Sequence, residues 1–320
     1  MLTSIAPTWL WFFFGLLITF FLALDLGLSS HGGEKEVSTK HALIWTCIWI
    51  ILATIFGIGV THLFGRDKGL EYFTGFVIEK ALSIDNIFVF IVIFNYFKVP
   101  RRFQHRVLFW GVICAFLLRA LFIFLGAALI SHFHWILYIF GAFLVYTGIK
   151  LVIVKDDDKV DPEKSLLVRG FRHFIPVTDS YEGAHFIVKR GLRIYATPLL
   201  LVLALIEGSD VVFAFDSIPA IFGVTTDPFI VYTSNIFAIL GLRNLYFVLA
   251  NFIDRFAYLK YGLGLVLTFV GAKMLAEWFY EVPVLASLIV IATLLSGTML
   301  ASIMATSRKK RAANTLEKIN

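Results

Sequence analysis

The segments EKALSIDNIFVF, residues 79–90, and IEGSDVVFAFDSIPAIF, residues 206–222, place acidic side chains inside runs that are otherwise apolar. Together they carry five carboxylates: Glu79, Asp85, Glu207, Asp210 and Asp216. A charged side chain at the centre of a membrane helix costs about 2.5–3.5 kcal/mol on insertion scales, so most membrane helices avoid one. Five acids in two such segments indicate a functional site within a membrane, because helix packing alone does not require so many.

The composition of the whole chain agrees with a membrane protein. Of its 320 residues, 59% are hydrophobic and only 16% are charged, whereas soluble domains have roughly 25% charged residues. Mean hydropathy is +0.85, so the membrane must be the solvent for most of the surface. The apolar segment 7–28 has no basic start and is longer than the core of a signal peptide, so we expect it to be a retained span.

Nine segments reach about 20 mostly apolar residues, the length that crosses a bilayer. They are residues 7–28, 41–64, 71–94, 106–130, 133–154, 196–216, 229–249, 257–276 and 283–305. The predicted fold class is therefore all-α, a polytopic membrane protein with nine transmembrane helices. If the N-terminus lies outside and the C-terminus in the cytoplasm, 22 Lys and Arg residues fall on the cytoplasmic side and two outside. This positive-inside pattern also accounts for the net charge of +6 without a nucleic-acid partner.

Three charged landmarks recur in the same order in two parts of the chain. Asp85, Arg119 and Lys150 are matched by Asp210, Arg243 and Lys273 at nearly the same spacing. Each copy has three spans, an odd number, so the second copy crosses the membrane in the opposite direction from the first. The copies therefore form an inverted 3+3 repeat core, spans 3–5 and 6–8, as in many secondary transporters.

This repeat divides the chain into five parts. Residues 1–70 hold spans 1 and 2, residues 71–154 the first repeat, and residues 196–276 the second; residues 277–320 hold span 9 and a basic cytoplasmic tail. Between the repeats, residues 155–195 are expected to form a cytoplasmic loop with a short amphipathic helix at 162–174 and a hairpin at 186–195.

The side chains near the acids predict a hard or borderline divalent ion. The further oxygen donors are Asn86, Ser83, Ser209 and Ser217, with Asp25 nearer the cytoplasmic end of span 1. Oxygen ligands without His or Cys suit Mn²⁺, Mg²⁺ or Ca²⁺. Lys80, Arg119 and Arg243 are expected to balance part of the negative charge. An unbroken helix cannot direct all the acids at one ion, so we predict that both helices are unwound or kinked near residues 80–85 and 208–216.

The two opening segments, together with VTTDPFIVYTSNIFAILGLRNLYF at 224–247 and HWILYIFGAFLVYTGIK at 134–150, resemble the TerC family over nearly the whole chain. The family is named for tellurite resistance, and the match is close to its Alx-like members, which are understood as manganese exporters. The resemblance implies that the five acids are the metal and transport carboxylates and that Asn86 and Ser217 belong to the same motifs. Asp25 matches an acid of the family's first span. The resemblance also implies a bacterial inner-membrane location.

The predicted function is export of Mn²⁺ as the transported substrate, with no enzymatic activity and no organic cofactor. The expected partners are membrane lipids, the divalent ion and protons that return on the same acids, because a carboxylate that loses its metal away from water favours a proton. Two alternatives remain open: transport of another cation, such as Ca²⁺/H⁺ exchange, or a membrane scaffold in a metal or tellurite stress response. Cys47 and Cys114 are expected to be small buried hydrophobic residues.

Overall fold

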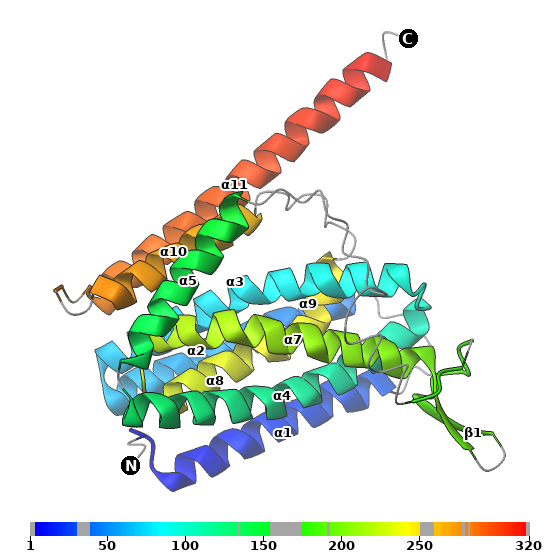
Figure 1. Ribbon diagram of the computed structural model, residues 1–320, viewed down its shortest axis with the longest axis horizontal. Coiled ribbons are helices and arrows are strands. Elements are labelled where there is room, and N and C mark those ends of the chain that lie inside the picture. The colour runs from blue at the N-terminus through cyan, green and yellow to red at the C-terminus, as the bar shows by residue number, and fades with distance from the viewer. Residues whose placement is uncertain are drawn as a thin grey trace.

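The computed structural model is built almost entirely from helices (Figure 1). It describes residues 4–30, 39–133, 135–153, 175–178, 180–190, 193–249, 259–276, 279–280 and 282–317. Within these ranges, six helices are long and apolar enough to cross a membrane: α1 (Thr8–Ser30), α2 (Thr39–Phe64), α4 (Arg101–His132), α5 (Ile136–Ile153), α7 (Pro198–Phe222) and α11 (Val284–Glu317). The chain is therefore consistent with a polytopic membrane protein, and the remaining three of the nine spans stay predictions.

The other three predicted spans correspond to a helix with several charges, a segment divided into two helices, and a helix of 18 residues. Helix α3 (Arg66–Tyr96) has 31 residues but carries the charges of the first acidic segment. The seventh predicted span is divided into α8 (Pro228–Leu240) and α9 (Leu242–Leu249), and the eighth corresponds to α10 (Leu259–Ala276).

Local sequence signals explain where these helices begin. Gly65 separates α2 from α3 with φ of +92°, a left-handed conformation that favours glycine. Helices α7 and α8 both begin with proline, which is preorganised for the first helical turn. The Asp227 side chain caps α8 by accepting hydrogen bonds from the backbone amides of Phe229 and Ile230.

The predicted hairpin is confirmed. Strands β1 (Ile187–Arg190) and β2 (Arg193–Ala196) pair antiparallel, with Ile187 opposite Ala196 and Arg190 opposite Arg193. The hairpin lies at the end of the bundle where α7 begins (Figure 1). The predicted amphipathic helix at 162–174 lies outside the described residues.

The predicted unwinding of the two acidic helices is wrong, whereas a kink in either helix stays a prediction. Helices α3 and α7 continue through residues 80–85 and 208–216, and Pro219 lies inside α7 only one turn from its end. Glu79 and Asp210 meet at Arg119 without a break, whereas Asp216 lies on the side of α7 that faces α5. The break is instead at Gly241, between α8 and α9.

Glycines bring α5 and α10 into very close contact. A Cβ atom placed on Gly141 would lie 3.0 Å from the carbonyl oxygen of Gly271, and one placed on Gly264 would lie 2.7 Å from that of Gly148. The two backbones therefore touch directly, as small residues allow in membrane helices. In Figure 1, α5, α10 and α11 run together at an angle to the other helices.

Two buried apolar clusters occupy different levels of the bundle. One contains Ile78, Ile123 and Ile218, and the other contains Ile87, Leu108 and Leu205. Both clusters draw on α3, α4 and α7. Between these levels, each of the three helices turns polar side chains inward, and the acidic segments lie there.

Candidate functional site

Arg119, near the middle of α4, is the centre of the buried polar layer. Its side chain is 1% exposed and forms ion pairs with Glu79 of α3 and Asp210 of α7. Its Nη1 group also donates to Ser217 Oγ and to Asn235 Oδ1, each at 3.1 Å. One guanidinium therefore joins side chains from α3, α4, α7 and α8 (the Arg119 cluster).

Asn86 extends this cluster by donating from Nδ2 to Asp210 Oδ1 at 3.2 Å. Asp210 thus accepts from Asn86 and, at 3.1 Å, from Arg119 Nη2. Four buried polar atoms nearby have no hydrogen-bond partner among the described residues: Glu79 Oε2, Asn86 Oδ1, Asn235 Nδ2 and Ser83 Oγ. Three of these are oxygens, so the layer holds oxygen atoms that the described residues leave unsatisfied.

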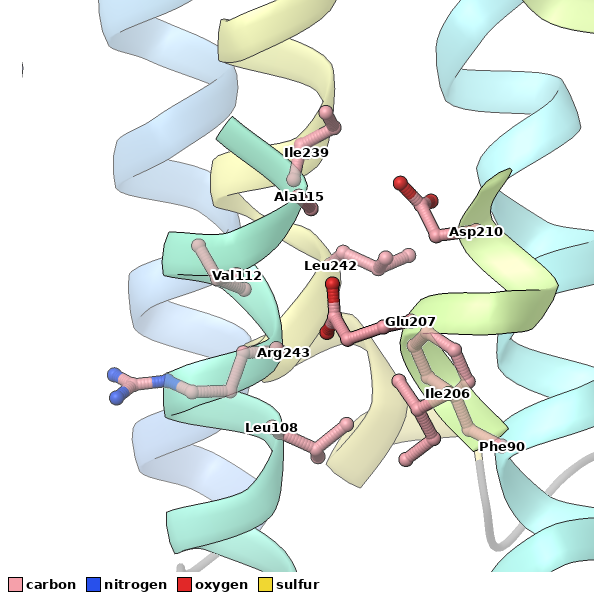
Figure 2. A pocket seen from close by; sticks show the side chains of 11 residues that line it. Phe90, Leu108, Val112, Ala115, Ile206, Glu207, Asp210, Ile239, Leu242 and Arg243 are labelled. Atoms are coloured by element: carbon pink, nitrogen blue, oxygen red, sulfur yellow. The ribbon is translucent and has the colours of Figure 1, made fainter. Parts of the chain in front are cut away.

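Glu207 lies one turn before Asp210 on α7 and faces a narrow cavity (Figure 2). Both of its carboxylate oxygens are buried and have no hydrogen-bond partner in the described part of the chain. The cavity offers about 20 Å³ to the centre of a water-sized sphere, which is about the room that one water molecule needs. Its wall includes Glu207 and Asp210 from α7, and Ile239, Leu242 and Arg243 from either side of the α8–α9 break.

Gly111 of α4 makes room for the Glu207 carboxylate. A Cβ atom at this position would lie 3.3 Å from Glu207 Oε1. In Figure 2 the Glu207 carboxylate points into the middle of the cavity, whereas the Arg243 side chain extends away from it. Glu207 is therefore the acid of this group that no described cation neutralises directly.

A second buried ion pair ties α9 to α1. Arg243 Nη2 lies 2.6 Å from Asp25 Oδ2, and the neighbouring Asn244 donates to the same oxygen at 3.3 Å. Asp25 and Arg243 are 2% and 4% exposed. Asp25 is therefore a partner of Arg243 and lies outside the Arg119 cluster.

The other sequence-predicted site residues lie elsewhere. Asp216 is half-buried and faces α5, where it meets Thr147 and Lys150. Ser209 donates back to the Ile206 carbonyl of its own helix at 2.7 Å. Asp85 is in α3, but its side chain lies outside the described part of the structure. The structure thus brings together Glu79, Asn86, Asp210 and Ser217, with Glu207 beside them.

Lys80 is a predicted charge-balancing residue without a carboxylate partner among the described residues. Its Nζ donates to the Ala238 carbonyl oxygen at 3.0 Å. That carbonyl belongs to the last turn of α8. Among the described residues, Arg119 and Arg243 pair with acids, and the charge-balancing role of Lys80 stays a prediction.

Two further residues of this region were missed in the sequence. Asn235 and Gly111 carry no charge, and only the polar side chain of Asn235 inside an apolar segment gave a signal. Among the described residues, no group of three His, Cys, Asp or Glu side chains is arranged to hold a metal ion.

Comparison with known proteins gives a consistent result. The family model described as "Integral membrane protein TerC family" matches residues 64–311. An "Uncharacterized membrane protein" of Myxococcus xanthus is 50% identical over 301 residues, covering 94% of each chain. "Putative membrane-bound redox modulator Alx" of Photorhabdus laumondii is 46% identical over 94% of this chain and 97% of its own length. The protein of the same name from Escherichia coli K12 is 45% identical over 93% and 95%. No solved structure matches the chain.

Proposed function

The chain belongs to the TerC family of integral membrane proteins, and on this premise we propose that it exports divalent manganese from the cytoplasm through the buried carboxylates of α3 and α7. The proposal extends to an inner-membrane location, with the N-terminus outside. The competing proposal is a redox role, which the name of the Alx relatives suggests.

One observation carries this proposal. Both carboxylate oxygens of Glu207 are buried and have no partner among the residues that the structure describes, and Glu207 lines a cavity that has room for one water molecule or one ion. Burying an ionised carboxylate without a partner is costly, so such a group favours a proton or a metal ion. Its neighbour Asp210 lines the same cavity.

The charge balance supports a cationic substrate. Glu79, Asp210 and Glu207 carry three formal negative charges, and Arg119 is the cation that binds two of them. A divalent ion at Glu207 and Asp210 competes with the guanidinium for Asp210. Binding and release of the ion are therefore expected to be coupled to movement of Arg119 between two sets of partners.

The arrangement of the helices supports a transport mechanism. Asp210 is 12 residues from either end of α7, which places it about 18 Å from each end at 1.5 Å per residue. The cavity also touches the α8–α9 break. Substrate sites of secondary transporters lie at this depth and use discontinuous helices.

The glycine contacts between α5 and α10 support the proposed inverted repeat. Gly141 and Gly264 are 123 residues apart, as are Gly148 and Gly271, close to the spacing of the charged landmarks. Gly141 approaches Gly271, and Gly148 approaches Gly264. Reciprocal contacts between equivalent positions are the pattern that a two-fold axis produces.

Manganese efflux from loaded membrane vesicles tests the proposal. Glu207→Gln keeps the shape of the side chain and removes its charge, and we expect efflux to fall at least about tenfold because a charge-assisted ligand is lost. Glu71→Gln is the matched control, since Glu71 pairs with Lys68 near the start of α3. Efflux by Glu207→Gln at the wild-type rate would refute the site.

The same vesicles separate the alternative substrates. Competition by Ca²⁺, Mg²⁺ and Zn²⁺ measures selectivity, and we expect Zn²⁺ to compete poorly at a site made of oxygen donors. Efflux at imposed pH gradients measures proton return. A rate that does not respond to the gradient contradicts proton coupling and leaves manganese export intact.

The redox role makes a different prediction. The chain has two cysteines, Cys47 and Cys114, and the structure places both as free thiols. Cys47 is exposed on α2, which corrects the expectation that it is buried. A Cys47→Ser, Cys114→Ser variant is expected to export manganese normally, whereas loss of function in this variant would favour thiol redox chemistry.

A further inference from the structure

The break between α8 and α9 interrupts the helical hydrogen bonds that a continuous helix would make to the last carbonyl oxygens of α8. The last four carbonyl groups of an α-helix have no amide partner within the helix, and the helix dipole makes this end partly negative. In α8 these carbonyls lie inside the bundle, because Ala238, Ile239 and Leu240 are buried. Buried carbonyls at an interrupted helix are a typical cation site.

The ammonium group of Lys80 occupies this position. Its Nζ donates to the Ala238 oxygen at 3.0 Å. The neighbouring Glu79 binds Arg119 instead, and Asp25 binds Arg243. The charge of Lys80 is therefore balanced by the carbonyl end of α8 and not by a described carboxylate.

Gly241 fits this ammonium closely. A Cβ atom at Gly241 would lie 2.7 Å from Lys80 Nζ and 3.7 Å from the Cβ atom of Trp49. Trp49 is 1% exposed. Any larger residue at position 241 must displace the ammonium, so the break is shaped around a small cation.

We propose that the C-terminal end of α8 is a second cation site, distinct from the carboxylate cavity, and that the Lys80 ammonium fills it as a tethered monovalent cation. This places a fixed positive charge at the break while the divalent ion passes at Glu207. The role in transport rests on the proposed function, but the site itself does not.

Removal of the ammonium tests the site without any transport assay. Lys80→Met vacates the carbonyl end, and a small monovalent cation from solution is expected to replace the lost charge. The melting temperature of purified Lys80→Met protein should rise by about 2 °C or more in sodium, potassium or ammonium chloride relative to choline chloride. The wild-type protein and the Lys68→Met control, altered on the same helix, should melt equally in all four salts.

A double-mutant cycle supplies the second measurement. Gly241→Ala should destabilise the wild-type background by its clash with Lys80 and cost much less in the Lys80→Met background. A melting temperature of Lys80→Met that is the same in all four salts, or a Gly241→Ala effect that is equal in both backgrounds, would overturn the proposal.

Transport then connects the site to the proposed function. Lys80→Met should lose manganese efflux and recover part of it as sodium or potassium is raised. If wild-type protein shows no manganese efflux while Lys80→Met keeps its salt-dependent melting temperature, the proposed function fails and the cation site stands.

Discussion

At the residue scale, the Arg119 cluster has two roles: it holds four helices together, and in the proposed mechanism it offers its carboxylates to a divalent ion. A buried arginine bound to two acids fixes four helices in place. Yet such an ion pair contributes little net stability, because desolvation offsets most of the attraction. In the proposed transport mechanism, a divalent ion would compete with Arg119 for the same carboxylates.

Replacing the arginine separates these roles. Arg119→Met leaves Glu79 and Asp210 buried without their cation, so the free energy of unfolding should fall by about 3–5 kcal/mol. Added Mn²⁺ should restore more stability to this variant than it adds to wild type, because the ion then has no competitor. Thermal unfolding with and without Mn²⁺ measures both effects, with Arg102→Met near the end of α4 as control. An equal response of the two proteins to Mn²⁺ would argue against competition at these acids.

Gly111 provides a test that leaves every charge in place. Gly111→Val adds a branched side chain where a Cβ alone would lie 3.3 Å from Glu207 Oε1. We expect manganese efflux to fall at least about tenfold, the effect of losing about 1.4 kcal/mol of binding. Gly59→Val on α2 is the control because no heavy atom lies within 4 Å of a Cβ there. Normal efflux by Gly111→Val would place the ion path elsewhere.

The sequence predicted much of this region, but not which acid meets which cation. Intramembrane acids are conspicuous because they are costly, so Glu79, Asp210 and Glu207 were identified directly. Their partners come from helices that are distant in the chain, and Arg119 is separated from Asp210 by 91 positions. The side of α7 that carries Asp216 faces α5, which periodicity alone could not show.

At the scale of the element, the α5–α10 contact is the closest helix packing that the glycines define. A Cβ on Gly148 would lie 2.5 Å from the carbonyl oxygen of Gly264, and a backbone atom cannot move aside as a side chain does. Gly148→Ala should therefore destabilise the protein by about 1–3 kcal/mol, the usual cost of overpacking. Gly297→Ala in α11 meets open space and should be neutral or slightly stabilising. Equal melting temperatures of the two variants would contradict the close crossing.

The hairpin element is attached to the helices by Tyr181, whose hydroxyl donates to the Phe97 carbonyl oxygen at 2.7 Å. Burial raises the pKa of Tyr181 to about 12. The folded state thus favours the neutral phenol. The resulting contribution to the free energy of unfolding is complete below the ordinary tyrosine pKa of about 10, and it is lost as pH rises through 12. Tyr181→Phe should cost about 0.5–1.5 kcal/mol. Proteolysis rates of the hairpin at pH 7 and 9 should be the same for wild type and higher for the variant at both values.

The elements themselves were predicted better than their interruptions. Apolar runs of about 20 residues fixed the positions of α1, α2, α4, α5, α7 and α11. The break was expected in the acidic helices, but it lies at Gly241 in a segment with no internal proline. The Lys80 ammonium from α3 donates to the last turn of α8 next to this break, and a contact over 158 positions leaves no local sign in either segment.

At the scale of the whole molecule, the two ends of α7 mark opposite faces of the protein. The hairpin directly precedes α7, and Thr226 follows its other end, in the loop before α8. A helix of 25 residues is about 37 Å long, enough to cross the hydrocarbon core of a bilayer, about 30 Å. Lys189 of the hairpin and Thr226 are both exposed, so each is open to a reagent on its own side of the membrane.

This geometry makes the proposed orientation measurable. In a background without the two native cysteines, Thr226→Cys should react with a membrane-impermeant maleimide in whole cells, whereas Lys189→Cys should react only after the cells are opened. The reason is the asymmetry of Lys and Arg, which the membrane potential and anionic lipids hold on the cytoplasmic side. The reverse labelling pattern would invert the molecule, and an exporter that takes manganese from the cytoplasm would then have to load it from the Thr226 end.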